Sequence, residues 1–416
     1  MAWYYYIAWL LTITQLVFMN QMLRNYRYAL KKSKKDRRSY QLRTVLIVPC
    51  KGKDTNFEHN IASFFYLDYN NYLLWFVVED TSDPAYDALC SLKEKLACRS
   101  KASDIQIFVA GKISVQNDSA QNGGVKRYSC GQKTHNLLYC YHRIPQDVEI
   151  IAFADSDICV PNNWLGHLVY PLRKSKHGVA TGYRWFVPQE NNLATISLAC
   201  VNAKIAQLLG DYTFNLAWGG SMAIRVDTFR QLGLDKIWSD TISDDTSITT
   251  AVKKAGKKVI FAPACLVASH EKTSWKDLFE FGRRQFLITR VCLPGIWWFG
   301  LFSSLYSIIG LWGTAAMAFY ASAIKDVHSS FFAAVPALFF VCQLSRAILR
   351  QKMAATILKD EYKKMKIAMA ADIIFFWVWS FLLLFFIISS AFGRTITWRG
   401  VRYKLLGPAQ TVTIAN

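Results

Sequence analysis

The chain has 416 residues, a formal net charge of +20 and 52% hydrophobic residues. Nucleic-acid-binding proteins can be this basic but rarely carry long uncharged apolar stretches, so this balance favours a protein on an anionic membrane that handles a polyphosphate substrate. The ten cysteines are scattered without a C-x-x-C pair, which argues against a zinc site or a disulfide framework and indicates a reducing compartment.

The N-terminal segment is apolar and long enough, at roughly 20 residues, to cross a bilayer as a helix. It has no basic residues in front of it and no small-residue cleavage site after it, so residues 1–23 are interpreted as an uncleaved anchor. Residues 24–42 form a basic juxtamembrane linker that includes Arg37 and Arg38. By the positive-inside rule this linker is cytoplasmic, although a solvated linker without an orienting role is the alternative.

Residues 43–274 mix apolar and charged residues as a globular domain does. Short apolar runs such as "TVLIVPC", "YLLWFVVED" and "EIIAFADSD" alternate with helix-like stretches. This alternation predicts an α/β domain with a mainly parallel sheet covered on both faces. Ligands of such sheets lie beyond the carboxyl ends of the strands, where Asp80 and Asp155 are expected.

The remainder of the chain is predicted to meet the membrane. Residues 275–293 alternate aromatic and basic side chains and form either an interfacial amphipathic helix or a plain domain helix. Residues 294–392 contain three apolar stretches and are expected to form a membrane bundle of about three helices. With the anchor these make four spans, which would place the C-terminus outside, whereas the basic tail of residues 393–416 favours the inside.

Asp155 and Asp157 form a D-x-D at the end of the run "IIAFAD". Such a pair can hold Mg²⁺ or Mn²⁺ together with waters and substrate phosphates, although D-x-D is most often a turn. Asp80 and the pair Asp244–Asp245 are its expected companions around one cleft. Taken alone, Asp244 and Asp245 also fit a helix N-cap.

Several segments together resemble the family 2-type GT-A glycosyltransferases, and most closely the ceramide glucosyltransferase group and its bacterial relatives. They are "KGKD", "FFYLDY", "EDTSDPA", "CGQKTHNLL", "FADSDICV", "WGGSMAIR", "SDDTSI" and "RRQFLITR". The resemblance covers most of residues 43–293. It implies a GT-A (Rossmann-like) catalytic domain with an N-terminal anchor and a C-terminal membrane bundle.

The resemblance also implies roles for particular residues. Asp155 and Asp157 would bind the metal on the donor diphosphate, and Asp245 would be the general base. The other residues expected at the catalytic and substrate-binding site are Lys51, Glu79, Asp80, Lys133, Asn136, Asp244 and Arg284. The closing Arg-x-x-Arg-Trp motif keeps only its first arginine, Arg284, so Arg283 or Arg290 would have to supply the second.

Two further candidates have ordinary alternatives. His270 could reach the diphosphate or the metal, or it is a hydrogen-bonded structural histidine. Trp218, Gly219 and Gly220 are expected to form a tight segment against the acceptor, because glycine permits close approach and tryptophan offers a stacking face; an ordinary turn is the alternative.

These observations predict an integral membrane protein with a cytosolic catalytic domain, in the inner membrane if the source is bacterial. The expected reaction is an inverting, metal-dependent transfer of one hexose, glucose, from a UDP-sugar to a lipid hydroxyl such as that of ceramide or a bacterial lipid alcohol. The alternatives are a processive polysaccharide synthase and a non-catalytic scaffold or transporter with a decayed transferase domain. No nucleic-acid partner is expected, and the sequence leaves the exact donor and the oligomeric state open.

Overall fold

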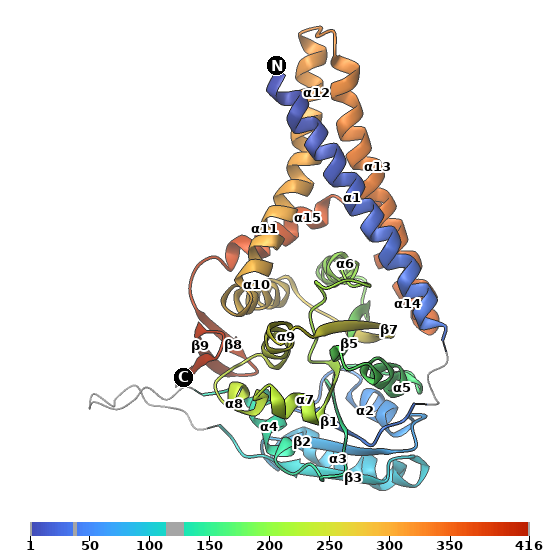
Figure 1. Cartoon of the computed structure of the whole chain (residues 1–416), viewed down its shortest axis with the longest axis vertical. Coiled ribbons are helices and arrows are strands. Elements are labelled where there is room, and N and C mark those ends of the chain that lie inside the picture. Colours follow the sequence, from blue (N-terminus) through green and yellow to red (C-terminus); the bar gives the residue numbers. More distant parts are fainter. Residues whose placement is uncertain (1, 36–39, 114–128, 415–416) are drawn as a thin grey trace, which may run out of the picture.

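The computed structural model describes residues 2–35, 40–113 and 129–414. Its centre is a seven-stranded sheet of order β3-β2-β1-β4-β6-β5-β7, in which only β6 runs antiparallel to its neighbours (Figure 1). The strands are β1 (Thr44–Pro49), β2 (Tyr72–Val78), β3 (Asp104–Val109), β4 (Ile150–Ala154), β5 (His177–Pro188), β6 (Ser221–Arg225) and β7 (Lys258–Glu271). The predicted mainly parallel α/β architecture is confirmed.

Helices cover both faces of this sheet, which explains why its strands are continuous apolar runs. In β1, Leu46 and Val48 join the core on one face, while Val45 and Ile47 join the core on the other. The first core is closed by α2 (Phe57–Phe65), α3 (Pro84–Leu96) and α5 (Trp164–Val169). The second is closed by α4 (Gln132–Tyr141), α7 (Val226–Gln231), α8 (Leu234–Trp238) and α9 (Asp244–Lys254).

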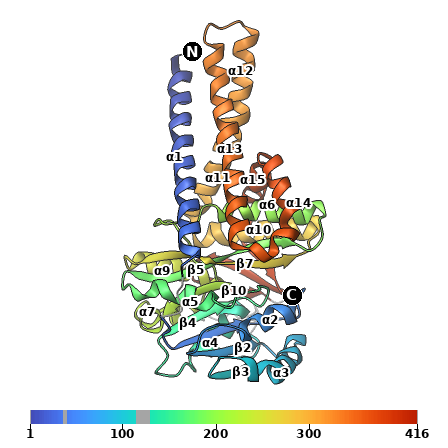
Figure 2. The same ribbon diagram turned by 90° about the vertical axis from the view of Figure 1, so that its right-hand side faces the viewer.

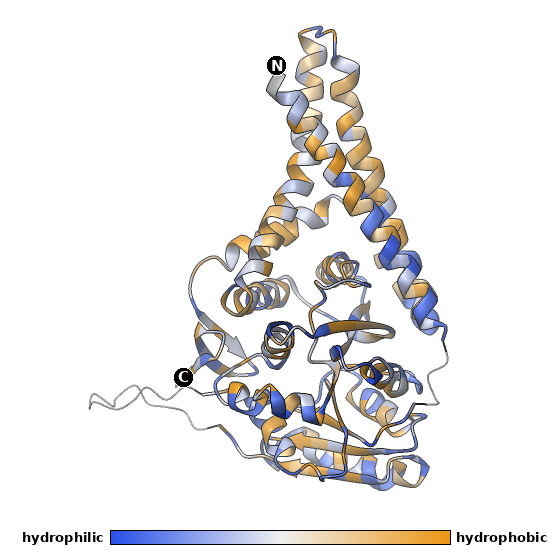
Figure 3. Ribbon diagram, viewed as in Figure 1, coloured by the Kyte–Doolittle hydropathy of each residue, from blue (hydrophilic) through white to orange (hydrophobic). Residues whose placement is uncertain are grey.

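Within the described residues, three helical segments are long and apolar enough to cross a membrane. They are α1 (Ala2–Ser33), α11 (Pro294–Ile308) continued through a π-helical turn into α12 (Thr314–Ala323), and α13 (Ser329–Ile357). These helices project away from the sheet domain (Figure 2), and their outer portions are mostly apolar (Figure 3). Helix α1 continues past the predicted anchor end at residue 23, so the first part of the basic linker is helical. Residues 36–39, with Arg37 and Arg38, lie outside the described residues.

The predicted last apolar stretch does not form a straight helix. It is divided between α14 (Tyr362–Ile374) and α15 (Val378–Ser389), which meet at an angle of 90°. Together with α6 (Leu193–Ala206) and α10 (Trp275–Cys292), these helices share one buried apolar cluster between the sheet domain and the long helices. Close packing is visible at Gly282 of α10, where a Cβ atom would lie 2.6 Å from the ring of Phe386.

A buried ion pair fixes α14 against α13. The Arg350 guanidinium donates to both carboxylate oxygens of Asp372, from Nε at 2.6 Å and from Nη2 at 2.5 Å. The two side chains are 3% and 0% exposed. Arg350 also donates from Nη1 to Gln207, at the C-terminal end of α6. Three elements that are distant in sequence therefore depend on one guanidinium.

The C-terminal segment is a folded sheet against the sheet domain, where the sequence suggested only a basic tail. Strands β8 (Thr395–Trp398), β9 (Val401–Gly407) and β10 (Gln410–Ile414) pair antiparallel. The Thr411 amide donates to the Asp240 carbonyl at 3.0 Å, and the Thr241 hydroxyl donates to the Pro408 carbonyl at 2.8 Å. These contacts place the tail beside the start of α9.

Candidate active site

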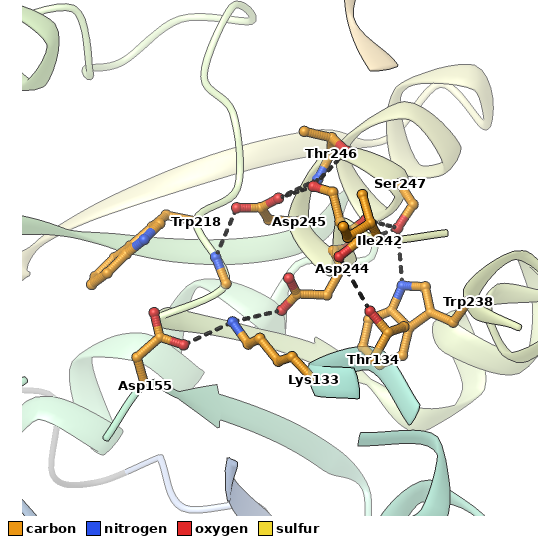
Figure 4. Close-up of polar contacts among 12 residues, drawn as sticks. Lys133, Thr134, Asp155, Trp218, Trp238, Ile242, Asp244, Asp245, Thr246 and Ser247 are labelled. Carbon is orange, nitrogen blue, oxygen red and sulfur yellow. Dashed lines mark hydrogen bonds and ion pairs between the residues drawn. The ribbon is translucent and has the colours of Figure 1, made fainter. Parts of the chain in front are cut away.

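Lys133, in the first turn of α4, lies between two carboxylates from different elements (Figure 4). Its Nζ is 2.7 Å from Asp155 Oδ1, just beyond the end of β4, and 3.2 Å from Asp244 Oδ2, at the start of α9. All three side chains are less than a quarter exposed. A cation at this point offsets the repulsion between two carboxylates that would otherwise be buried together.

The two carboxylates respond differently to this cation. Burial alone would raise the pKa of Asp155, but the short ion pair with Lys133 holds it below its ordinary value. Burial raises the pKa of Asp244 to about 6; Lys133 opposes the rise, and the nearby charges of Asp245 and Asp155 add to it. The site therefore contains one firmly ionised carboxylate and one that takes up a proton in mildly acidic solution.

This difference predicts a pH-dependent stability that the Asp244→Asn variant should remove. The pKa of Asp244 is higher in the folded state than its unfolded value of about 4. Protonation of this carboxyl therefore stabilises the fold, and the stabilisation is complete below about pH 4. The contribution is then lost as the pH rises through about 6. The melting temperature of the wild type relative to Asp244→Asn should therefore fall between pH 4 and pH 7 in detergent. A constant difference would contradict the assignment; Asp227→Asn, an exposed change on α7, is the matched control.

Asp245 is held by three hydrogen bonds. Its Oδ1 accepts from the Ser243 hydroxyl at 2.6 Å and from the Thr246 amide at 2.7 Å, and its Oδ2 accepts from the Gly219 amide at 3.2 Å. The N-cap of α9 is Ser243, whose hydroxyl accepts from the Thr246 amide. The reading of Asp244 and Asp245 as the cap is therefore wrong: they are the first two residues of the helix, and their carboxylates face the site.

Asp157 has spare capacity for a ligand. Its Oδ2 lies 3.6 Å from Arg184 Nη1, while its buried Oδ1 has no hydrogen-bond partner among the described residues. Burial, followed by the charge of Asp155, raises the pKa of Asp157 to about 6. A buried oxygen without a partner is costly unless something binds it. The pair Asp155 and Asp157 therefore fits a divalent cation whose remaining ligands come from a substrate.

His270 is placed elsewhere by the structure. Its Nε2 lies 3.0 Å from Glu361 Oε2, and Glu361 also pairs with Lys364 at 3.0 Å. Across the described parts of the chain, no group of three or more His, Cys, Asp and Glu side chains is arranged to hold a metal ion. The predicted set of Asp155, Asp157 and His270 is thus not brought together, and the hydrogen-bonded structural role of His270 is the one observed.

The glycines after Trp218 allow the chain to pass against the carboxylates. A Cβ atom on Gly219 would lie 2.4 Å from Asp244 Oδ2, and one on Gly220 would lie 2.5 Å from Asp155 Oδ2. Trp218 itself is nearly buried, and the Arg184 guanidinium lies 5.4 Å from its ring centroid. The close approach expected of this segment is present, and it is directed at the acidic cluster.

The other predicted donor-site residues have polar partners of their own. Lys51 pairs with Glu79 at 2.8 Å, past the ends of β1 and β2. Asp80 accepts from the Ser82 amide and faces Lys112 at 3.4 Å, and both interactions hold its pKa below the ordinary value. The remaining residue, Asn136 of α4, accepts a hydrogen bond from Gln132.

The three arginines of α10 have different surroundings. Arg283 donates to the carbonyls of Ser389 and Phe392, and Arg290 donates to the carbonyl of Gly393. Arg284 instead lies near Arg184: the two guanidiniums are 5.6 Å and 5.5 Å from the ring centroid of Phe281. Burial lowers the pKa of Arg284, and repulsion from Arg184 and Arg399 lowers it further. Sequence reasoning missed Arg184, since a single charge inside the apolar strand β5 gives no local signal of its partner.

The chain is similar to two solved structures. The mannosyltransferase PcManGT from Pyrobaculum calidifontis, in complex with GDP-Man and Mn²⁺, is 15% identical, with 92% of this chain and 96% of that chain covered and a TM-score of 0.45. The glucosyl-3-phosphoglycerate synthase from Mycobacterium tuberculosis, in complex with Mn²⁺, UDP and glucosyl-3-phosphoglycerate, is 11% identical, with 58% and 76% covered and a TM-score of 0.34. These low TM-scores do not support a residue-by-residue comparison.

The sequence profile of glycosyl transferase family 21 matches residues 7–409, which include most of α1, the sheet domain, the other candidate membrane spans and most of the C-terminal sheet. The matched residues contain all the motifs that resemble the ceramide glucosyltransferase group. The chain is thus a sugar transferase, and it belongs to glycosyl transferase family 21.

Proposed function

We propose that this enzyme transfers a single glucose from UDP-glucose to the hydroxyl group of a membrane lipid, with inversion at the anomeric carbon. The observation that carries the proposal is the position of Asp245: its carboxylate is fixed by three hydrogen bonds at the start of α9, beside the Lys133 cluster. A carboxylate oriented in this way can accept the proton of an attacking hydroxyl.

The reaction is a single displacement. The lipid hydroxyl oxygen forms a bond to the anomeric carbon, the bond to the donor diphosphate breaks, and the hydroxyl proton passes to Asp245. No covalent intermediate with the protein is needed, so an α-linked donor gives a β-glycoside. Asp245 orients the acceptor, and the cations Lys133, Arg184 and Arg284 stabilise the departing negative charge.

Asp155 and Asp157 are the residues that would hold Mg²⁺ or Mn²⁺, since the buried Asp157 Oδ1 finds no hydrogen-bond partner in the part of the chain that the structure describes. A divalent cation bound there supplies Lewis-acid stabilisation of the leaving diphosphate. Lys133 keeps Asp155 ionised before the donor arrives, and Arg184 orients Asp157 from the opposite side.

The layer of α6, α10, α14 and α15 supports a lipid acceptor. These helices lie between the sheet domain and the candidate membrane spans, and α10 exposes Trp275 and Phe279. Exposed aromatic side chains next to basic ones favour the membrane–water interface. The same layout supports a cytosolic catalytic domain, with the C-terminal sheet on its side.

The proposal is tested by incubating the full chain in detergent with radiolabelled UDP-glucose, a total lipid extract and either Mn²⁺ or EDTA. We expect label to enter the organic phase only with the metal, and a single hexose on the lipid by mass spectrometry. UDP-galactose, UDP-GlcNAc and UDP-glucuronate are compared as donors, and ceramide is compared with the extract.

Other outcomes would overturn the proposal. Label retained in a long polymer would support a processive synthase. If none of the UDP-sugars were transferred or hydrolysed with either metal, a non-catalytic protein would be favoured. Transfer that persists in EDTA would remove the metal from the proposal while leaving the glycosyl transfer in place.

A further inference from the structure

The turn between β8 and β9 carries an arginine in an unfavourable backbone conformation. Trp398 pairs with Val401, so the loop consists of Arg399 and Gly400, with φ angles of 49° and 80°. Two positive φ values define the tight hairpin turn that Asn-Gly or Asp-Gly usually occupies. An arginine at the first position carries local strain, which suggests that its side chain has a role that asparagine would not fulfil.

The Arg399 side chain reaches the catalytic domain. Its Nη1 donates to Asp54 Oδ1 at 2.8 Å and its Nη2 donates to Asp54 Oδ2 at 2.6 Å. Asp54 lies in the loop that follows β1, at the carboxyl end of the sheet. The paired geometry is the one in which a guanidinium also binds a phosphate group. Asp54 therefore holds the guanidinium in a position and orientation suited to an oxyanion.

Arg399 lies at the same edge of the sheet as the acidic pair. Asp54, to which it is bound, follows β1, and Asp155 follows β4, and these two strands are adjacent and parallel. From there the charge of Arg399 opposes the effect of burial on the pKa of both Asp155 and Asp157. It also repels Arg284, on which Arg184 acts in the same direction. The guanidiniums of Arg184 and Arg284 lie 5.5 Å and 5.6 Å from the ring centroid of Phe281, and Arg184 is also 3.6 Å from Asp157. Three arginines from three elements therefore gather near this edge of the sheet. Several guanidinium groups in a partly buried space are stabilised by a multivalent anion.

The hairpin is anchored to the elements that carry the acidic cluster. The Tyr403 hydroxyl accepts from the Gln132 amide at 3.3 Å, one residue before Lys133. The Asp240 carbonyl and the Thr241 side chain bind β10 and the turn before it. Arg283 and Arg290, the two expected substitutes for the missing arginine of the closing motif, bind backbone carbonyls just before β8. They hold the hairpin in place and are not free to bind a donor.

We propose that Arg399, at the tip of the C-terminal hairpin, binds the diphosphate of the nucleotide-sugar donor, and that Asp54 holds its guanidinium ready until the donor arrives. This inference rests on the proposed function, since it takes a nucleoside diphosphate as the ligand. It assigns the missing second arginine to a segment outside α10.

The test is a calorimetric titration of the full chain in detergent with UDP in the presence of Mn²⁺. Arg399→Ala should bind UDP about 10- to 100-fold more weakly than the wild type, because a charge-assisted pair of hydrogen bonds to phosphate is lost. Arg399→Lys keeps the positive charge but cannot form the paired hydrogen bonds of a guanidinium, so its affinity for UDP should lie between those of the wild type and Arg399→Ala. Arg402→Ala is the matched control, an exposed arginine on β9 of the same hairpin, and should bind UDP as the wild type does.

The Asp54→Asn variant distinguishes two roles of Arg399: binding the donor, or only holding the hairpin against the sheet domain. If Arg399 binds the donor, Asp54→Asn frees the guanidinium and should bind UDP at least as tightly as the wild type. If the pair only fastens the hairpin, Asp54→Asn and Arg399→Ala should weaken UDP binding by the same factor, which would overturn the inference. The inference would also be overturned if the wild type and Arg399→Ala bound UDP with the same affinity. No UDP binding by the wild type would instead refute the proposed function.

Discussion

Asp245→Asn should transfer sugar roughly 10²- to 10⁴-fold more slowly than the wild type, because the amide cannot accept the acceptor proton. The loss is expected in kcat, with the KM for the UDP-sugar nearly unchanged, since Lys133, Asp155 and Asp157 keep their arrangement. The amide can still accept the hydrogen bonds from Ser243 and Thr246 at Oδ1. The measurement is initial-rate kinetics with saturating lipid acceptor.

The controls separate proton acceptance from folding. Asp227→Asn introduces the same chemical change on the exposed face of α7 and should transfer at the wild-type rate. Ser243→Ala removes one of the hydrogen bonds that orient Asp245 while leaving the carboxylate, so its loss should be smaller than that of Asp245→Asn. A near-normal rate for Asp245→Asn, with a melting temperature equal to the wild type, would remove Asp245 from the role of base.

Arg350→Met should destabilise the protein by about 3–5 kcal/mol, because it leaves the fully buried carboxylate of Asp372 without its charged partner. Gln351, which donates to the same carboxylate, cannot replace the lost charge. Thermal unfolding in detergent should show a large fall in the melting temperature, together with reduced protection of α14 in hydrogen exchange.

The double variant Arg350→Met with Asp372→Leu identifies the cause. Removing both charges replaces the ion pair by apolar side chains, and such replacements are often neutral in buried sites. The double variant should therefore recover most of the lost stability, apart from the hydrogen bonds of Gln207 and Gln351. Equal melting temperatures for the single and double variants would show that packing, and not the unpaired charge, determines the loss.

The features that could be predicted from the sequence depend on local patterns. Strands β1, β2 and β4 are buried on both faces, so each is a short apolar run, and β4 ends just before the polar residue Asp155. The long helices α11–α12 and α13 are recognised by the near absence of charges in their outer turns. Both signals depend on residues that are adjacent in the chain.

The features that could not be predicted depend on distant partners. Nothing near Lys133 indicates that it would lie between Asp155 and Asp244, because α4, β4 and α9 are separate elements that only the tertiary fold brings together. His270 was weighed as a metal ligand, but its partner Glu361 lies 91 residues away, beyond two candidate spans. The strands β8 to β10 were read as a tail because their docking surface is on the loop before α9.

The anchoring of the C-terminal hairpin has a consequence for how the enzyme matures in the cell. Strands β8 to β10 leave the ribosome after the last apolar helix, yet Tyr403 and Thr411 contact the segments that position Lys133 and Asp245. A nascent chain can therefore complete its candidate membrane spans and its central sheet while the cluster around Lys133 still lacks its C-terminal support. A premature stop codon after Gly393 would remove this support from a polypeptide that keeps all of these helices.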